Sequence, residues 1–164
     1  MDTTQAIIKR RSIRRFKKKH IAPEIVEEIL ELGAWAPSGL NNQPWKFKVV
    51  EGALKDSLAQ FTHYSFIVEK ADKMILVFLD KHLSYHREKD LMAIGACIQN
   101  MLLAIHAKKL GACWLGEILN QKKAIHAFLH IPKTLELVAC IALGVPAAYP
   151  KKGTRKKLKN LMIR

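Results

Sequence analysis

Cysteine is scarce in this 164-residue chain, which contains only three such residues. Cys97, Cys113 and Cys140 lie far apart, each within an apolar run, and no Cys-x-x-Cys pair occurs. This number and spacing argue against both a disulfide framework and a zinc ribbon. Buried free thiols are typical of a reducing compartment, so we expect a cytoplasmic protein.

Other signals are missing as well. No uninterrupted apolar run approaches the roughly 20 residues that a membrane-spanning helix needs, and residues 1–4 lack the basic-then-apolar order of a signal peptide. There is no Gly-x-Gly-x-x-Gly fingerprint and no Walker loop, so a Rossmann or ATP-binding interpretation lacks its motif. The length and the 49% content of hydrophobic residues instead predict one globular domain, residues 1–164, with no membrane partner.

Acidic residues are absent from two strongly basic segments. Residues 9–20 hold eight Lys or Arg and residues 151–164 hold seven, although the whole chain carries 28 basic against 14 acidic groups. The other 138 residues therefore carry 13 basic and 14 acidic groups and are nearly neutral. Such segments attract phosphate, whether on a cofactor, a nucleic acid or an acidic membrane. Few aromatic residues interleave with the basic ones, which makes a nucleic-acid partner the weaker expectation.

Apolar spacing predicts an irregular alternation of helices and strands, which favours an α+β fold over a doubly wound one. The run at 73–79 is apolar throughout and predicts a strand buried on both faces. The apolar spacing at 91–110 predicts a central helix, with Gly111 as its C-cap. Further helices are expected at about 3–11, 23–36, 54–61 and 120–129, and further strands at 45–50, 112–115 and 135–143.

Specific side chains are expected at the caps and buried faces of these helices. The first helix is expected to be capped by Asp2 or Thr3 and to turn Ala6 and Ile7 inward. Asn120 is expected to cap the last helix. For the second helix, the spacing predicts a buried stripe of Ile25, Ile29, Leu32 and Ala36.

The segment from Ala36 to Phe47, A-P-S-G-L-N-N-Q-P-W-K-F, joins a predicted helix to a predicted strand. Proline ends the helix, and Gly39 is expected to supply backbone angles that are closed to other residues. Asn41, Asn42 and Gln43 offer donors and acceptors that suit a planar heterocycle edged with carbonyls and ring nitrogens. From the spacing alone, an ordinary helix-to-strand turn is the stronger interpretation, because short motifs match often by chance.

Arg10, Ser12 and Arg14 alternate, so in an extended segment all three point the same way. Guanidinium forks and a hydroxyl are suitable phosphate ligands. The same run also fits a solvated basic arm or a nucleic-acid contact.

Four segments in order, R-R-S-I-R at 10–14, the amide-rich segment, G-A-C-W-L-G at 111–116 and A-L-G-V-P at 142–146, resemble the nitroreductase family of FMN-dependent oxidoreductases. The resemblance covers nearly the whole chain. It implies a nitroreductase-like α+β fold, with a central, mostly antiparallel sheet flanked by helices, in an intertwined homodimer. It also implies noncovalent FMN at the dimer interface, NADH or NADPH as reductant, and a ping-pong route to a nitroaromatic, a quinone or a similar acceptor.

The resemblance also implies site residues. Arg10, Arg11, Ser12 and Arg14 would hold the phosphate, the ribityl chain and the ring edge, and Arg155 matches a C-terminal phosphate contact. Residues of the partner subunit would reach the flavin as well, namely Pro37, Ser38, Gly39 and Asn41. Leu115 and Gly116 match the backbone beside the reactive edge of the ring. No catalytic acid, base or nucleophile is expected, because the chemistry belongs to the flavin.

The sequence is also compatible with two other functions, and it does not predict a metal site. A basic nucleic-acid-binding module and a flavin storage or sensing protein without turnover both remain compatible with the residues. His82 and His86, and likewise His126 and His130, lie four apart, but neither pair has an intervening glutamate or an obvious third ligand, so no metal site is expected. Only about ten polar residues separate the buried strand from the central helix, which predicts an uncovered site that discriminates poorly between acceptors.

Overall fold

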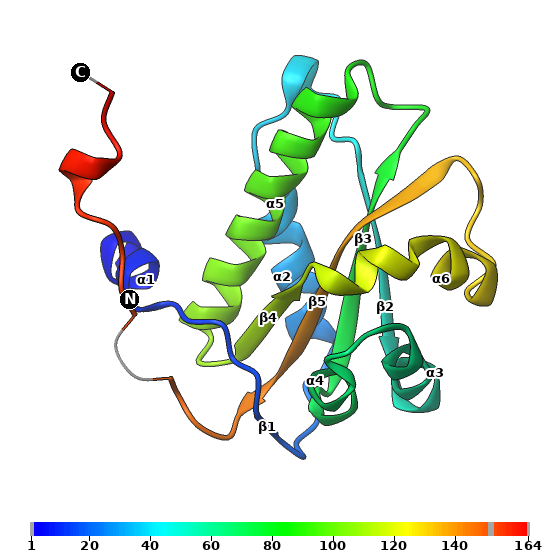
Figure 1. The fold of residues 1–164 in the computed structure, drawn as a ribbon, viewed down its shortest axis with the longest axis horizontal. Coiled ribbons are helices and arrows are strands. Elements are labelled where there is room, and N and C mark those ends of the chain that lie inside the picture. Colours follow the sequence, from blue (N-terminus) through cyan, green and yellow to red (C-terminus); the bar gives the residue numbers. More distant parts are fainter. Residues whose placement is uncertain (1, 151–152, 164) are drawn as a thin grey trace.

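The computed structural model describes residues 2–150 and 153–163; Lys151, Lys152 and Arg164 of the C-terminal basic segment lie outside this range. A five-stranded sheet lies at the centre, in the order β1-β5-β3-β2, and β4 also pairs with β5 (Figure 1). All strand pairs are antiparallel, as predicted. The strands are β1 (Phe16–Lys17), β2 (Trp45–Glu51), β3 (Lys73–Asp80), β4 (Gly111–Leu115) and β5 (Leu135–Pro146).

Helices cover both faces of this sheet (Figure 1). On one face α2 (Pro23–Ala34) and α5 (Arg87–Ala107) enclose one apolar core, and on the other α3 (Gly52–Ser57), α4 (Ser65–Lys70) and α6 (Lys122–Phe128) enclose a second. A short N-terminal helix, α1 (Thr3–Lys9), lies outside both layers. The 3-10 turns are η1 (Gly39–Asn41), η2 (Leu58–Phe61), η3 (Glu117–Gln121) and η4 (Leu158–Asn160).

Strand β3 is the centre of the molecule, and all eight of its residues are buried. Ile75 and Val77 point to the α2–α5 side, whereas Leu76 and Phe78 point to the opposite core. This alternation follows from the two-residue period of a strand, and a strand covered on both faces is apolar throughout. The prediction made for 73–79 is therefore confirmed.

Helix α5 crosses one face of the sheet as the predicted central helix. By length and composition alone it is apolar enough to span a membrane, but its buried residues pack into the core against α2 and the sheet. The predicted cap at Gly111 is wrong, because the helix ends at Ala107 with Lys108 as its C-cap, and Lys109 adopts the left-handed conformation. Gly111 instead begins β4, where a Cβ atom would lie 2.8 Å from Cβ of Ile13.

The buried stripe of α2 differs from the prediction. Ile29 is buried, but Val26 and Gly33 complete the stripe, while Leu32 is 42% exposed. A Cβ atom on Gly33 would lie 2.5 Å from Cγ of Met101. The close approach of α5 at this glycine turns the helix so that Leu32 faces outward.

Three other local predictions also need correction. Asp2 caps α1 and Ala6 is buried, as expected, but Ile7 is 54% exposed. The helix expected at 54–61 is divided into α3 and η2, and α4 follows without having been predicted. Asn120 lies inside η3 and does not cap α6, which begins at Lys122.

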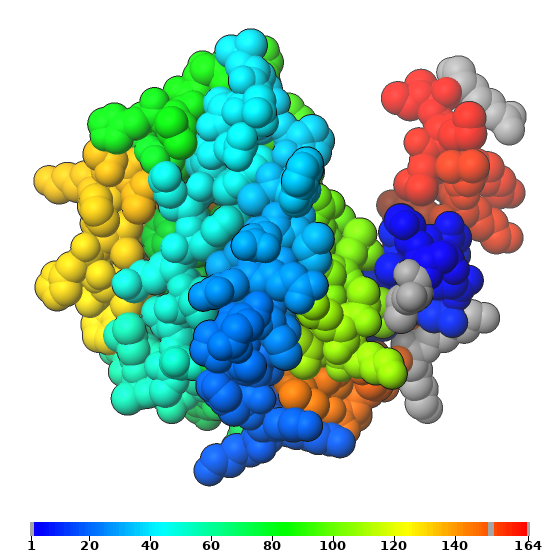
Figure 2. All heavy atoms as spheres, turned by 180° about the vertical axis from the view of Figure 1, so that it is seen from behind, coloured from blue at the N-terminus to red at the C-terminus, as the bar shows by residue number. Residues whose placement is uncertain are grey.

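The two ends of the described chain lie side by side and project away from the body of the molecule (Figures 1 and 2). Figure 2 shows α1 in blue next to the red C-terminal segment. Helix α1 contacts α5, whereas a gap separates the red segment from the body. We call α1 together with residues 153–163 the terminal arms. They expose large apolar side chains: Ile7, Ile8, Leu158, Leu161, Met162 and Ile163.

Candidate functional site

The basic segment at 10–14 is extended and runs alongside β4. Ser12 forms a parallel bridge with Ala112, and the backbone N–H of Ile13 donates to the Ala112 carbonyl at 2.8 Å. Ile13 is buried, so its neighbours Ser12 and Arg14 turn to the other side of the segment. The extended conformation assumed for this run is therefore present.

Guanidinium groups from both ends of the chain lie close together at this segment. Burial lowers the pKa of Arg10, and the charges of Arg155 and Arg11 lower it further. The guanidinium of Arg11 donates to the carbonyls of Ile8 and Arg10, at 2.7 and 2.8 Å. Within residues 2–150 and 153–163, no carboxylate forms an ion pair with Arg10, Arg14 or Arg155. A phosphate group would neutralise this cluster.

His106, near the end of α5, is a neighbour of the cluster that the sequence did not suggest. It lines a small cavity together with Arg10 and Arg11. Its Nε2 atom is buried and has no hydrogen-bond partner among the described residues. Burial lowers the pKa of His106, and the charges of Arg10 and Arg11 lower it further, so this imidazole is neutral beside the guanidinium groups.

Leu115 and Gly116 lie at the end of β4 and share a hollow of about 260 Å³ with Arg14, Cys113 and Trp114. The space beside the α-carbon of Gly116 is open, with no atom within 4 Å of a Cβ position. The structure thus brings together one predicted guanidinium and the predicted backbone segment.

Glu117 borders the same hollow but is engaged elsewhere. Its carboxylate accepts hydrogen bonds from Oγ1 of Thr62 at 2.5 Å and from the backbone N–H of His63 at 3.2 Å. The hydrogen bond from Thr62 is the main reason that the pKa of Glu117 is lowered, so the group is a carboxylate at neutral pH and not a proton donor.

The amide-rich segment forms a tightly wound turn around η1. Leu40, Asn41 and Gln43 all have positive φ angles, at 55°, 53° and 45°. Inside the turn, the hydroxyl of Ser38 accepts from the backbone N–H of Gln43 at 3.0 Å, and Nε2 of Gln43 donates to Oδ1 of Asn41 at 3.2 Å. Asn41 is exposed and is held by Gln43, as a binding group would be.

The expectation that Gly39 supplies the unusual backbone angles is wrong, because the left-handed residues are its neighbours. Glycine is needed there for a different reason. A Cβ atom at position 39 would lie 1.9 Å from the hydroxyl oxygen of Tyr85. Tyr85 therefore packs directly on the turn.

One chain does not bring the two groups of predicted residues together. The turn is joined to Asp90, at the start of α5, by a 2.8 Å hydrogen bond from Asn42, whereas Arg10 shares a cavity with His106 near the end of that helix. The sixteen positions between Asp90 and His106 correspond to roughly 24 Å of helix. Pro37, Ser38, Gly39 and Asn41 are thus far from the arginine cluster of their own chain (Figure 1).

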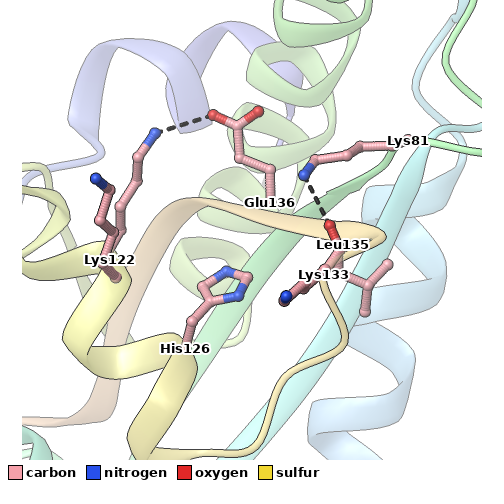
Figure 3. A pocket seen from close by; sticks show the side chains of 7 residues that line it. Lys81, Lys122, His126, Lys133, Leu135 and Glu136 are labelled. Atoms are coloured by element: carbon pink, nitrogen blue, oxygen red, sulfur yellow. Dashed lines mark hydrogen bonds and ion pairs between the residues drawn. The ribbon is translucent and has the colours of Figure 1, made fainter.

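A separate and larger hollow, of about 430 Å³, lies between α6 and the start of β5 and contains none of the predicted site residues (Figure 3). Nζ of Lys122 donates to Glu136 at 3.0 Å, and Nζ of Lys81 donates to the Lys133 carbonyl at 2.7 Å. Nε2 of His126 accepts from the backbone N–H of Leu137. Much of the polar lining is therefore satisfied by protein groups.

The histidine pairs do not form metal sites in the described part of the chain. No group of three His, Cys, Asp or Glu side chains converges among residues 2–150 and 153–163. His82 precedes α5 and His86 is its N-cap, so the pair does not share a helical face. His130 lies beyond α6 with a positive φ angle.

We compared the sequence and the fold of this chain with those of known proteins. The family model described as "Nitroreductase family" matches residues 7–78 and 62–145. A crystal structure from Desulfovibrio desulfuricans, of a protein assigned as a nitroreductase and in complex with FMN, superposes with a TM-score of 0.95. It is 45% identical, and the match covers 100% of this chain and 97% of that one.

Two relatives extend the comparison. An NADH dehydrogenase of Thermus thermophilus is 37% identical over 185 residues, covering 92% of this chain and 90% of the relative. A protein of Methanothermobacter thermautotrophicus, assigned as an NADH dehydrogenase/NAD(P)H nitroreductase, is 31% identical over 158 residues, with 94% and 82% covered.

Proposed function

Because this chain belongs to the nitroreductase family, we propose that it is an FMN-dependent NAD(P)H oxidoreductase. It takes hydride from NADH or NADPH and passes electrons to a nitroaromatic, a quinone or a similar small acceptor. The observation that carries the proposal is the set of guanidiniums at Arg10, Arg14 and Arg155, which form no ion pair with a carboxylate in the described residues. Arg14 also lines the hollow at Leu115–Gly116. The 45% identical structure that contains FMN supports the proposal.

The phosphate end of the cofactor is assigned to the basic segment. Arg10, Ser12 and Arg155 offer charged and neutral donors to a phosphate group, and the half-buried position of Arg10 strengthens its electrostatic attraction. Arg11 orients the same segment by binding backbone carbonyls. Arg14 and the backbone of Leu115 and Gly116 are assigned to the ring, because they line one hollow.

The rest of the site is assigned to a second copy of the chain. Pro37, Ser38, Gly39 and Asn41 lie too far from the arginines of their own subunit to share a cofactor with them, so a homodimer supplies them from its partner. Exposed apolar side chains support such a dimer: Trp35 and Leu40, beside the turn, are 85% and 87% exposed, and the terminal arms are apolar as well. Arms that project from the body suit an intertwined dimer, in which each subunit wraps the other (Figure 2).

Bound FMN supplies the hydride and electron chemistry, and the protein supplies binding and orientation. The residues assigned here include no acid, base or nucleophile. The open space beside Gly116 admits the nicotinamide first and the acceptor afterwards, which is a ping-pong route. The six residues 81–86 between β3 and α5 are too few to form a separate lid, so we expect a broad range of acceptors.

The apolar cores and the cysteines support proposals for the domain organisation and the location of the protein. We propose that residues 1–164 act as a single FMN-binding domain, since both apolar cores share one sheet. The three cysteines are free and buried, which supports a cytoplasmic location.

A visible spectrum of the purified protein tests the proposal. We expect flavin absorbance, either as purified or after addition of FMN, which is bleached by NADH or NADPH without oxygen and restored by a quinone. Arg10→Ala should weaken FMN binding by at least about tenfold, because a charged hydrogen bond is lost. Arg15→Ala is the matched control, since Arg15 lies in the same segment but is not assigned to the site.

Three results would contradict the proposal. Protein that fails to take up FMN would refute flavin binding, and steep salt-dependent binding to RNA that is unaffected by FMN would favour the nucleic-acid module instead. Flavin uptake without NADH or NADPH oxidation, whatever the acceptor, would indicate a storage or sensing protein.

A further inference from the structure

The turn that carries Asn41 needs external support. Three of its non-glycine residues, Leu40, Asn41 and Gln43, adopt left-handed backbone angles within four positions. Side chains disfavour this conformation, so it persists only where the surrounding structure holds it. The two hydrogen bonds that side chains make inside the turn join Ser38, Asn41 and Gln43 to one another but not to the body of the protein.

Asn42 makes the connection to the body. Its Nδ2 atom donates to Oδ1 of Asp90 at 2.8 Å and to the carbonyl of Leu83 at 3.0 Å. Asn42 therefore joins the turn to the start of α5 and to the segment that leads into it. Tyr85 adds a second contact by packing its hydroxyl against Gly39.

Asp90 is unusual for a carboxylate, because it is fully buried. Its second oxygen accepts hydrogen bonds from Oγ of Ser84 at 2.7 Å and from the backbone N–H groups of Tyr85 and His86, at 3.1 and 3.2 Å. Burial raises the pKa of Asp90, but the hydrogen bonds from Ser84, Asn42 and the backbone outweigh it and leave the pKa below its usual value. Asp90 is thus a fixed negative charge that orders every donor around it.

We propose that Asp90, acting through Asn42, is a positioning residue for the flavin site of the partner subunit. It fixes the backbone of the turn and therefore the direction in which Asn41 is presented. This inference rests on the proposed function, in which the turn is lent to the second copy. Asp90 itself is buried and lies outside the assigned binding residues, so it influences the flavin site only through the turn.

Asp90 also stabilises α5, since it accepts from the N-cap residue His86. The test must therefore separate the two roles, and the network offers a matched pair of variants. Asn42→Ala removes the donor that reaches Asp90 from the turn. Ser84→Ala removes a side-chain donor of similar length to the same carboxylate, but on the α5 side.

Four measurements are made on both variants and on the unaltered full-length protein: thermal unfolding, hydrogen exchange of residues 38–43 without FMN, the dissociation constant of FMN, and visible circular dichroism of the bound flavin. Both variants should lose thermal stability. Only Asn42→Ala should accelerate exchange in the turn, weaken FMN binding by about tenfold and alter the flavin dichroism.

The outcomes that refute the inference are distinct from those that refute the proposed function. If the unaltered protein binds FMN but the two variants weaken it equally, or neither does, Asp90 has a structural role only. If the unaltered protein takes up no FMN at all, the proposed function is wrong. The role of Asp90 toward a flavin is then wrong as well, regardless of the hydrogen-exchange rates of residues 38–43.

Discussion

A complementation experiment tests whether the two halves of the site come from different subunits. Arg10→Ala removes a guanidinium from the basic segment, and Asn41→Ala removes the exposed amide of the turn. Both residues are peripheral to the apolar cores, and removal of Arg10 also relieves its repulsion with Arg11 and Arg155, so neither change should prevent folding. In the proposed homodimer, each variant then carries the same defect in both sites.

The expected recovery follows from the roughly 24 Å of α5 that separates the two positions within one chain. In a mixed dimer, the intact turn of the Arg10→Ala subunit meets the intact arginine of the Asn41→Ala subunit, so one site is whole and the other carries both defects. Random mixing makes about half of all dimers mixed, and about a quarter of all sites regain full affinity in a two-fold symmetric assembly.

The assay is a titration with FMN, followed by quenching of flavin fluorescence, on variants that were unfolded together and refolded. The control is each variant refolded alone, which should show only weak sites. Recovery of a tight class amounting to about a quarter of the sites is expected. If the mixture shows only the weak sites of the two parents, although mixed dimers have formed, each subunit completes its own site and the reasoning fails.

Three further predictions concern single contacts. The hydrogen bond from Arg87 is the main reason that the pKa of Glu136 falls to about 2. The ionised Glu136 therefore stabilises the fold above its ordinary pKa near 4.5, and this contribution is lost as the pH falls toward 2. In Glu136→Gln, the free energy of unfolding measured with urea should fall by about 1–2 kcal/mol less between neutral and acid pH than in the unaltered protein, after screening. Gly39→Ala should displace Tyr85 and cost about 1–3 kcal/mol, whereas Gly39→Ala combined with Tyr85→Ala should cost less than the sum, which additive losses in a double-mutant cycle would contradict. Lys55 is buried and donates to two carbonyls at the end of α4, so Lys55→Met should cost about 1–3 kcal/mol in the same assay, and the exposed Lys123→Met should show no comparable loss.

The elements that sequence predicted best are those whose pattern depends on burial alone. Strand β3 is apolar at nearly every position because helices cover both of its faces, so a continuous run identifies it without knowledge of its neighbours. The prediction of which face of α2 is buried was wrong, because that face depends on a contact with another helix. Gly33 is buried because Met101 of another helix needs its space, and hydrophobic periodicity does not register a glycine as a core residue.

The local geometry of the candidate site could be predicted where its residues are adjacent in sequence, but not where distant segments meet. Arg10, Ser12 and Arg14 are recognisable from their own spacing, and their extended conformation is present. Asp90 was missed because periodicity placed it before the central helix, in a polar loop. Its burial becomes understandable only when Ser84, Asn42 and two backbone N–H groups converge on it from separate segments.

The charge distribution and the placement of the termini together favour an anion at the terminal arms. Fifteen of the 28 basic groups lie in two short segments, and the fold brings the start of the first segment beside the described part of the second (Figure 2). Arg10 lies close enough to Arg155 for the two charges to repel, which disfavours the arrangement unless an anion offsets it. A bound phosphate removes that repulsion, so FMN should hold the arms in place as well as being held by them. The arms of the apoprotein should therefore be protected from trypsin by added FMN, and the protection should weaken as salt screens the phosphate.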